Sequence, residues 1–200
     1  MNKYITEFIG TFFLVLVAGL TGNPIAIGST LMVMIFAGGH ISGGHYNPAV
    51  TLAVLLRRRI SLGDALVYIG SQLAGALIAA FVISIFVKLP DNSAQQIDTA
   101  KALLAEVLGT FALAYVVLNV ATAKANAGNS FYGLAIGFTV LAMAFAFGEI
   151  SGGAFNPAVA IGQSVIKAFD WANIWIYLIG CFAGGALAAF VFNMNNPGDK

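Results

Sequence analysis

This chain contains two copies of an Asn-Pro-Ala triplet, and their residue types and spacing could act on a solute. Residues 41–50 read ISGGHYNPAV and residues 150–159 read ISGGAFNPAV, so eight of the ten positions are identical. Asn is a favoured helix N-cap and Pro a favoured first helical residue, so each triplet predicts a helix that begins at its Asn. A capping Asn still holds an NH2 donor that can face a passing molecule. The triplets are Asn47-Pro48-Ala49 and Asn156-Pro157-Ala158.

The electric field at these two helix starts favours neutral solutes. Each helix N-terminus carries roughly half a positive charge. Two such ends about 5 Å from a cation, at an effective dielectric of about 20, repel it by roughly 3 kcal/mol, and lost hydration in a narrow apolar passage costs several more. A single triplet is usually a surface turn or a helix cap. Two copies in matching apolar repeats instead predict a passive passage for small uncharged molecules that excludes cations.

The composition of the chain indicates that these triplets lie in a membrane. Hydrophobic residues make up 60% of the 200 residues, charged residues make up 8%, and the mean hydropathy is +0.91. Soluble domains carry about 25% charged residues, so we interpret the chain as an integral membrane protein with a single domain over residues 1–200. The net charge of +1 gives no support to nucleic-acid binding, and the single cysteine, Cys181, excludes an intramolecular disulfide.

Six longer apolar segments are each expected to be a transmembrane helix. They cover residues 4–21, 25–39, 63–87, 102–122, 131–148 and 172–192. Two shorter helices, 48–56 and 157–168, follow the triplets. They are too short to span and are expected to be re-entrant half-helices, because non-helical backbone at membrane depth must be buried in protein or line a cavity. The predicted fold class is all-α, with six transmembrane helices and two re-entrant half-helices.

The similarity between the two halves extends beyond the triplets. Residues 7–12 (EFIGTF) match residues 106–111 (EVLGTF), and the repeats cover about 1–89 and about 101–200. Three spans per repeat is an odd number, so the second repeat must enter from the opposite side of the membrane. Such inverted repeats place their site near the bilayer midplane, where the broken helices meet. The glycines expected to permit close helix packing are Gly70, Gly75, Gly180 and Gly184.

Lys and Arg are concentrated on one predicted side, which the positive-inside rule assigns to the cytoplasm. The run Arg57–Arg59 lies in a short loop, where the rule is strongest. Both termini are then cytoplasmic, Pro90–Thr99 is an external loop, and Trp171 and Trp175 lie at the outer interface. The inside set is Lys3, Arg57, Arg58, Arg59, Lys124 and Lys200, and the outside set is Lys88, Lys101 and Lys167.

The paired motifs resemble the major intrinsic protein family, the aquaporins and glycerol facilitators. The resemblance covers nearly the whole chain and rests on residues 42–50, on Asn156-Pro157-Ala158, and on Glu7 and Glu106 in the first helix of each repeat. It implies a right-handed six-helix bundle with one pore per subunit, a homotetramer, and a passive channel for water and small neutral solutes without catalysis or a cofactor. The short chain and short loops fit a prokaryotic inner membrane.

The resemblance also implies an outer selectivity constriction, which falls here on Ile27, Ala144, Gly153 and Val159. Most members have Arg at the last of these positions, and many water-selective members have His at the second. This chain has no Arg after Arg59. We therefore expect a wider and more apolar constriction that discriminates poorly among solutes. Glycerol facilitators typically carry Asp where this chain has Ala160, so glycerol transport is not directly supported.

Further polar residues lie in or beside the apolar segments. Glu7 and Glu106 occupy matching positions inside spans, where an unpaired carboxylate is costly, so we expect them to accept hydrogen bonds from the two re-entrant loops and brace them. His45 either lines the pore or makes a loop hydrogen bond, and we favour the structural role. Glu149, expected near the external mouth, either gives the vestibule a negative potential or braces its loop. No metal site is expected, because no Cys, Asp or Glu accompanies His40 and His45 at ligand spacing.

Other functions compete with a water channel. The same fold would suit a channel that prefers ammonia, glycerol or urea and conducts water poorly, because an apolar constriction can dewet. A non-conducting structural or sensory membrane protein is a second alternative. An enzyme is disfavoured because the sequence has no nucleophile–base pair, metal cluster or phosphate loop. An energised transporter is disfavoured because the intramembrane carboxylates are better explained as braces.

Overall fold

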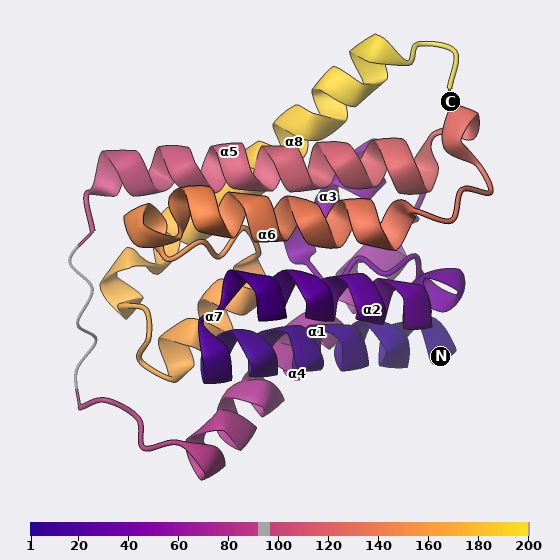
Figure 1. Cartoon of the computed structure of the whole chain (residues 1–200). Helices are drawn as coiled ribbons and strands as arrows, with labels where there is room; N and C mark the ends of the chain where they lie inside the picture. Colours follow the sequence, from indigo (N-terminus) through magenta and orange to yellow (C-terminus); the bar gives the residue numbers. More distant parts are fainter. Residues whose placement is uncertain (92–96, 200) are drawn as a thin grey trace.

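The computed structural model describes residues 1–91 and 97–199, which form a bundle of α-helices (Figure 1). In this part of the chain six α-helices are long and two are short. Along the chain, each short α-helix stands between two long ones. In chain order they are α1 (Asn2–Thr21), α2 (Pro24–Ser42), α3 (Pro48–Leu56), α4 (Leu62–Phe86), α5 (Thr99–Val117), α6 (Tyr132–Ser151), α7 (Pro157–Val165) and α8 (Ile174–Asn195). A π-helical turn, Leu118–Thr122, extends α5.

The lengths of the helices separate spans from half-helices. In the described residues, six helices are long and apolar enough to cross a membrane. The short helices α3 and α7 have nine residues each, and at 1.5 Å per residue they reach about 14 Å, less than half of a ~30 Å hydrocarbon core. The predicted fold class, six spans with two half-helices, is confirmed.

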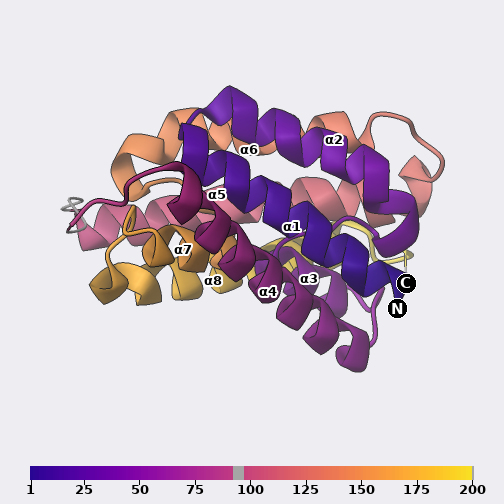
Figure 2. The ribbon, with the colours of Figure 1, turned by 90° about the horizontal axis from the view of Figure 1, so that it is seen from below.

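The two repeats are interlocked rather than merely adjacent. Within the repeats α1 packs on α4 and α5 packs on α8, and Figure 2 shows the first of these pairs side by side. Across the repeats α2 packs on α6. Each half-helix lies against the last long helix of the other repeat, α3 on α8 and α7 on α4. Neither repeat therefore encloses its own half-helix.

Several predicted helix bounds differ from the structure by up to three residues. The helices α2, α6 and α8 end three residues later than predicted, at Ser42, Ser151 and Asn195. The sequence predicted a half-helix over 157–168, but α7 ends at Val165. Lys167 then takes a φ of +62°, as Arg58 does after α3. Left-handed backbone cannot continue an α-helix, so the chain turns at the same point in both repeats. The apolar pattern did not reveal this turn, because Ile166 and Phe169 are both buried although the helix has ended.

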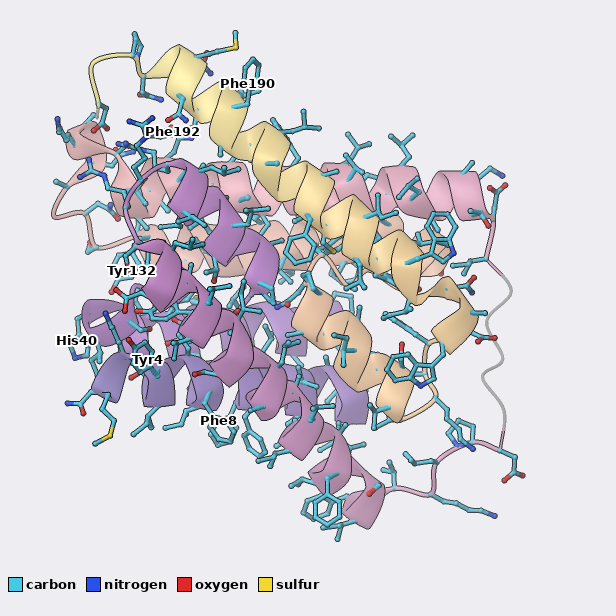
Figure 3. All side chains as sticks on the ribbon, turned by 180° about the vertical axis from the view of Figure 1, so that it is seen from behind. Tyr4, Phe8, His40, Tyr132, Phe190 and Phe192 are labelled. Carbon is cyan, nitrogen blue, oxygen red and sulfur yellow. The ribbon has the colours of Figure 1, made fainter. Side chains whose placement is uncertain are left out.

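Both termini lie at one end of the bundle (Figure 1). That end carries a cluster of charges. The Asp199 carboxylate lies 2.8 Å from the Arg57 guanidinium and accepts the backbone N–H of Lys124 at 2.8 Å. That N–H and the Arg57 charge hold the pKa of Asp199 below its usual range. The guanidinium of Arg57 also stacks 4.7 Å from the ring centre of Phe192, which points inward from α8, whereas Phe190 points outward (Figure 3).

The basic residues predicted to be cytoplasmic gather at this same end. Lys3 pairs with Asp64 at 2.8 Å, and Lys3 and Arg59 line one cavity there. Figure 3 shows His40 at this end too. Which end faces the cytoplasm stays a prediction. Lys200, and residues 92–96 of the predicted external loop Pro90–Thr99, lie outside the described residues.

Gly75 in the first repeat and Gly184 in the second each allow two helices of the same repeat to cross closely. A Cβ atom at Gly75 would lie 2.5 Å from the Phe8 carbonyl oxygen, and one at Gly184 would lie 2.5 Å from the Val107 carbonyl oxygen. Both obstacles are helix backbone, so no side-chain rotation relieves them. A Cβ atom at Gly70 would meet no atom within 4 Å. Within one chain, Gly70 therefore does not permit a close helix contact, contrary to the prediction.

We expect Gly184→Ala to destabilise the protein and Gly70→Ala not to. Overpacking typically costs about 1–3 kcal/mol, whereas replacing a helical glycine in open space favours the helix by up to ~1 kcal/mol. The two variants make the same chemical change, so each controls for the other. Fluorescence-detected size-exclusion chromatography after heating measures both. Equal thermal midpoints would contradict the close approach of α5 and α8.

Candidate functional site

The two half-helices begin at the asparagines of the triplets. The Asn47 side-chain oxygen accepts the backbone N–H groups of Ala49 and Val50 at 2.8 and 3.4 Å. The Asn156 oxygen accepts those of Ala158 and Val159 at 2.9 and 3.5 Å. Pro48 and Pro157 occupy the first helical positions, where the missing N–H has no intrahelical partner to lose. The cap therefore fixes the orientation of each side-chain amide.

The two asparagine amides join the re-entrant loops to one another. The Asn47 Nδ2 group donates to the Phe155 carbonyl at 2.9 Å, and the Asn156 Nδ2 group donates to the Tyr46 carbonyl at 2.9 Å. Each NH2 group has two hydrogens. One is committed to the opposite loop, so each asparagine keeps one N–H for a passing solute rather than the whole NH2 group.

A buried carboxylate supports the first loop. The Oε1 atom of Glu7 accepts the Ser42 hydroxyl at 2.7 Å and the His45 backbone N–H at 3.0 Å. Its Oε2 atom accepts the Tyr46 backbone N–H at 2.7 Å and the Gln72 amide at 2.8 Å. Glu7 is fully buried. Every neighbour donates, which suits the acceptor-only ionised form of a carboxylate.

The second loop has the same support from its own repeat. Glu106, also fully buried, accepts the Ser151 hydroxyl at 2.7 Å and the backbone N–H groups of Ala154 and Phe155 at 3.0 and 2.7 Å. The Cys181 thiol takes the place of the glutamine amide, at 3.5 Å. The structure thus places Glu7 and Glu106 in the bracing positions that the repeat predicted.

The residue before each asparagine has a strained backbone and a ring that fills the bundle. Tyr46 and Phe155 both have a φ of +48°, a conformation that is uncommon for bulky residues. A Cβ atom at Gly10 would collide with the Tyr46 ring, and one at Gly109 would collide with the Phe155 ring. The glycine of each segment, EFIGTF or EVLGTF, therefore leaves space for this aromatic ring, which packs the loop against the first helix of its repeat.

A cavity of about 540 Å³ extends from the asparagines toward the end of the bundle opposite the termini. The four residues predicted for the constriction all line this outer cavity, and none of them has a polar side chain. The cavity brings together Ile27, Ala144, Gly153 and Val159 with Asn47 and Asn156. The wall around them includes further apolar side chains, such as Leu31, Val140 and Phe145.

The backbone of the loops adds hydrogen-bond acceptors to this wall. Gly44 and His45 line the outer cavity from the first loop, and Gly153 and Ala154 line it from the second. Their carbonyl oxygens accept no hydrogen bond from another described residue. The passage therefore offers several acceptors and, from the asparagines, two N–H donors.

Glu149 lies at the rim of the outer cavity and is exposed. It forms no hydrogen bond or ion pair with another described residue, and Glu106 already binds the N–H groups of that loop. The alternative in which Glu149 braces the loop therefore receives no support from the contacts. Its placement agrees with the vestibule alternative.

His45 lies between two cavities. It lines the outer cavity and also a second one of about 350 Å³, at the end of the bundle that holds the termini. Its Nδ1 atom is 3.1 Å from the Thr51 hydroxyl oxygen. That hydroxyl donates its only hydrogen to the Asn47 carbonyl and accepts from the Gln72 amide. With the hydroxyl in this orientation, neutral His45 carries its proton on Nδ1, and Nε2 is the acceptor.

Sequence reasoning missed one polar residue of the outer cavity. Gln163 lines it from α7, and it follows Asn156 by seven residues and Val159 by four. Residues at this spacing share one face of a helix, so helical periodicity would have found it. Tyr68 and Tyr177 also support the loops from outside, and because they are equivalent in the two repeats, the repeat match could have found them. Gln72, whose counterpart is Cys181, had no comparable signal.

Known proteins share this architecture. The family described as "Major intrinsic protein" matches residues 1–192. "Glycerol uptake facilitator protein-like 6" of Lactiplantibacillus plantarum is 36% identical over 208 residues, which cover 95% of this chain and 96% of that protein. "Aquaporin NIP1-1" of Oryza sativa subsp. japonica is 34% identical over 218 residues, covering 97% and 74%. The structure of the aquaglyceroporin from Plasmodium falciparum superposes with a TM-score of 0.82 at 22% identity, covering 96% and 95%, and so shares the fold.

We expect Glu106→Gln to destabilise the protein while Glu149→Gln leaves stability unchanged. A glutamine turns an NH2 group toward donors that need an acceptor, and each buried donor left unsatisfied costs about 1–3 kcal/mol. Glu149→Gln makes the same change at a carboxylate without a protein hydrogen bond. The thermal midpoints of the two purified variants measure the difference. A midpoint for Glu106→Gln as high as that of Glu149→Gln would refute the brace.

Proposed function

Because this chain belongs to the major intrinsic protein family, whose members are passive membrane channels, we propose that it conducts water and other small uncharged solutes. The observation that carries the proposal is the pair of asparagine N–H donors where the two half-helices meet. Each half-helix also directs its positive end toward that point. A neutral solute can exchange hydrogen bonds there, whereas a cation meets the field of both helix ends.

The outer constriction is proposed to be wide and apolar. Ile27, Ala144, Gly153 and Val159 line the outer cavity together and supply no polar side chain. An Arg in the place of Val159 would add five N–H donors, a charge and bulk. Without it, the four constriction positions offer no hydrogen-bonding side chain, and selection among neutral solutes depends on the other polar groups that line the cavity.

A second candidate follows from the same apolar lining. A constriction without polar side chains can lose its water by dewetting. The channel would then favour ammonia, glycerol or urea and conduct water poorly. The ratio of solute flux to water flux separates this candidate from a general water and solute channel.

We also propose a homotetramer in a cell membrane, with both termini cytoplasmic, and a prokaryotic inner membrane as its location. The cluster of basic residues at the end that holds the termini supports this orientation. Large apolar side chains on the outside of the bundle, among them Phe81, Phe138 and Phe190, suit contact with lipid or with neighbouring subunits.

We expect Val159→Arg to lower glycerol permeability by about tenfold or more, which corresponds to roughly 1.4 kcal/mol in the barrier. The guanidinium narrows the constriction and replaces apolar surface with donors. Val159→Leu is the matched control, because it adds apolar bulk without charge. Stopped-flow light scattering of proteoliposomes under glycerol and sucrose gradients measures glycerol and water permeability.

The outcomes of this experiment bear on different parts of the proposal. Fast water flux without glycerol flux in the wild type, unaffected by Val159→Arg, would place the constriction elsewhere. Wild-type protein that conducts neither water nor any neutral solute, although correctly inserted, would contradict the channel function itself.

A further inference from the structure

The Gln163 side chain is buried yet has no protein partner. The residue is 6% exposed, and no described residue forms a hydrogen bond with its amide. Its amide atoms are not among the fully enclosed atoms that lack a partner, so they reach accessible space. Gln163 lines the outer cavity together with Asn156 and Val159. A largely buried amide is costly unless water or a solute binds it, so it presents both a donor and an acceptor to the contents of the cavity.

The other repeat supplies an internal comparison. Val50 and Val159 are equivalent in the two triplet segments, and Gln163 corresponds to Val54, seven residues after Asn47. Val54 lines the second cavity, at the opposite end of the passage. A half-helix of this fold therefore accommodates an apolar residue at this position. The amide is a feature of the outer cavity alone.

The other polar groups of the outer cavity are mostly acceptors. The carbonyls of Gly153 and Ala154 have no partner among the described residues, and the Glu149 carboxylate lies at the rim. Within the described residues, no Lys or Arg lines the outer cavity. The donors are the Gln163 NH2 group and one N–H from each asparagine. A lining with more acceptors than donors complements an uncharged solute that is rich in N–H groups.

We propose that Gln163 is a specificity-determining residue that binds small uncharged amides, such as urea, in the outer cavity. Such a solute forms two antiparallel hydrogen bonds with the Gln163 amide, donating one N–H to Oε1 and accepting one N–H from Nε2. Its other N–H groups meet the loop carbonyls. An arginine would offer donors only, whereas glutamine offers both. This assignment rests on the channel function proposed above.

The side chain of Gln163 can be changed without removing the bonds that hold the end of α7. The carbonyl oxygen of Gln163 accepts the backbone N–H groups of Ala168 and Phe169 at 2.9 and 3.2 Å. These are main-chain bonds, so they persist in a variant. Gln163→Met keeps the length of the side chain and removes both the donor and the acceptor. Gln163→Asn keeps the amide on a shorter side chain and serves as the conservative control.

The test compares urea, glycerol and water permeability of wild type, Gln163→Met and Gln163→Asn in proteoliposomes. We expect Gln163→Met to lower the ratio of urea to water permeability about 3- to 10-fold, the effect of losing one or two hydrogen bonds. The ratio of glycerol to water should fall less, and Gln163→Asn should recover part of the urea flux. A purely structural defect would lower all three permeabilities together.

Two results would overturn the assignment, and they are distinguishable from failure of the channel function. If the wild type conducts water or glycerol and Gln163→Met leaves the urea to water ratio unchanged, Gln163 does not determine specificity. If Gln163→Asn behaves like Gln163→Met in every ratio, the length of the side chain matters and the amide does not. A wild type without any flux contradicts the channel proposal before Gln163 is considered.

Discussion

The absence of water in a bilayer core is the constraint on which the rest of the structure depends. Two loops leave the helical conformation at membrane depth, so protein groups must satisfy their backbone N–H groups. Glu7 and Glu106 do so from the first helix of each repeat, each binding two consecutive N–H groups and a serine hydroxyl. Because the carboxylates are fully buried, they are stable only with these donors in place. Loop and carboxylate therefore require one another.

The inverted repeat extends this dependence to the whole chain. Each loop is braced by its own repeat, but its tip donates to the other repeat through Asn47 and Asn156. Each half-helix also packs against the last helix of the opposite repeat. The meeting point at the centre of the bundle is consequently a product of both repeats. It leaves one N–H on each asparagine for the solute, which is a smaller donor set than the free amides would provide.

The two ends of the passage differ although the repeats are alike. Toward the termini His45 lies between the outer cavity and the second cavity. Toward the other end lies the outer cavity, in which Gln163 supplies a polar side chain from α7. The asymmetry arises from a few substitutions between equivalent positions, Ala154 for His45 and Gln163 for Val54. Discrimination among neutral solutes is therefore expected to reside in these positions rather than in the shared framework.

The sequence by itself determined the spans, the starts of the half-helices and the equivalent bracing roles of Glu7 and Glu106. Apolar run length, capping chemistry and the cost of a buried carboxylate are local properties. Family resemblance placed the four constriction positions. Tertiary structure alone decided the bonds between Asn47 and Phe155 and between Asn156 and Tyr46, and the open amide of Gln163. These depend on how two repeats, more than a hundred residues apart in the chain, pack together, and no local pattern encodes that geometry.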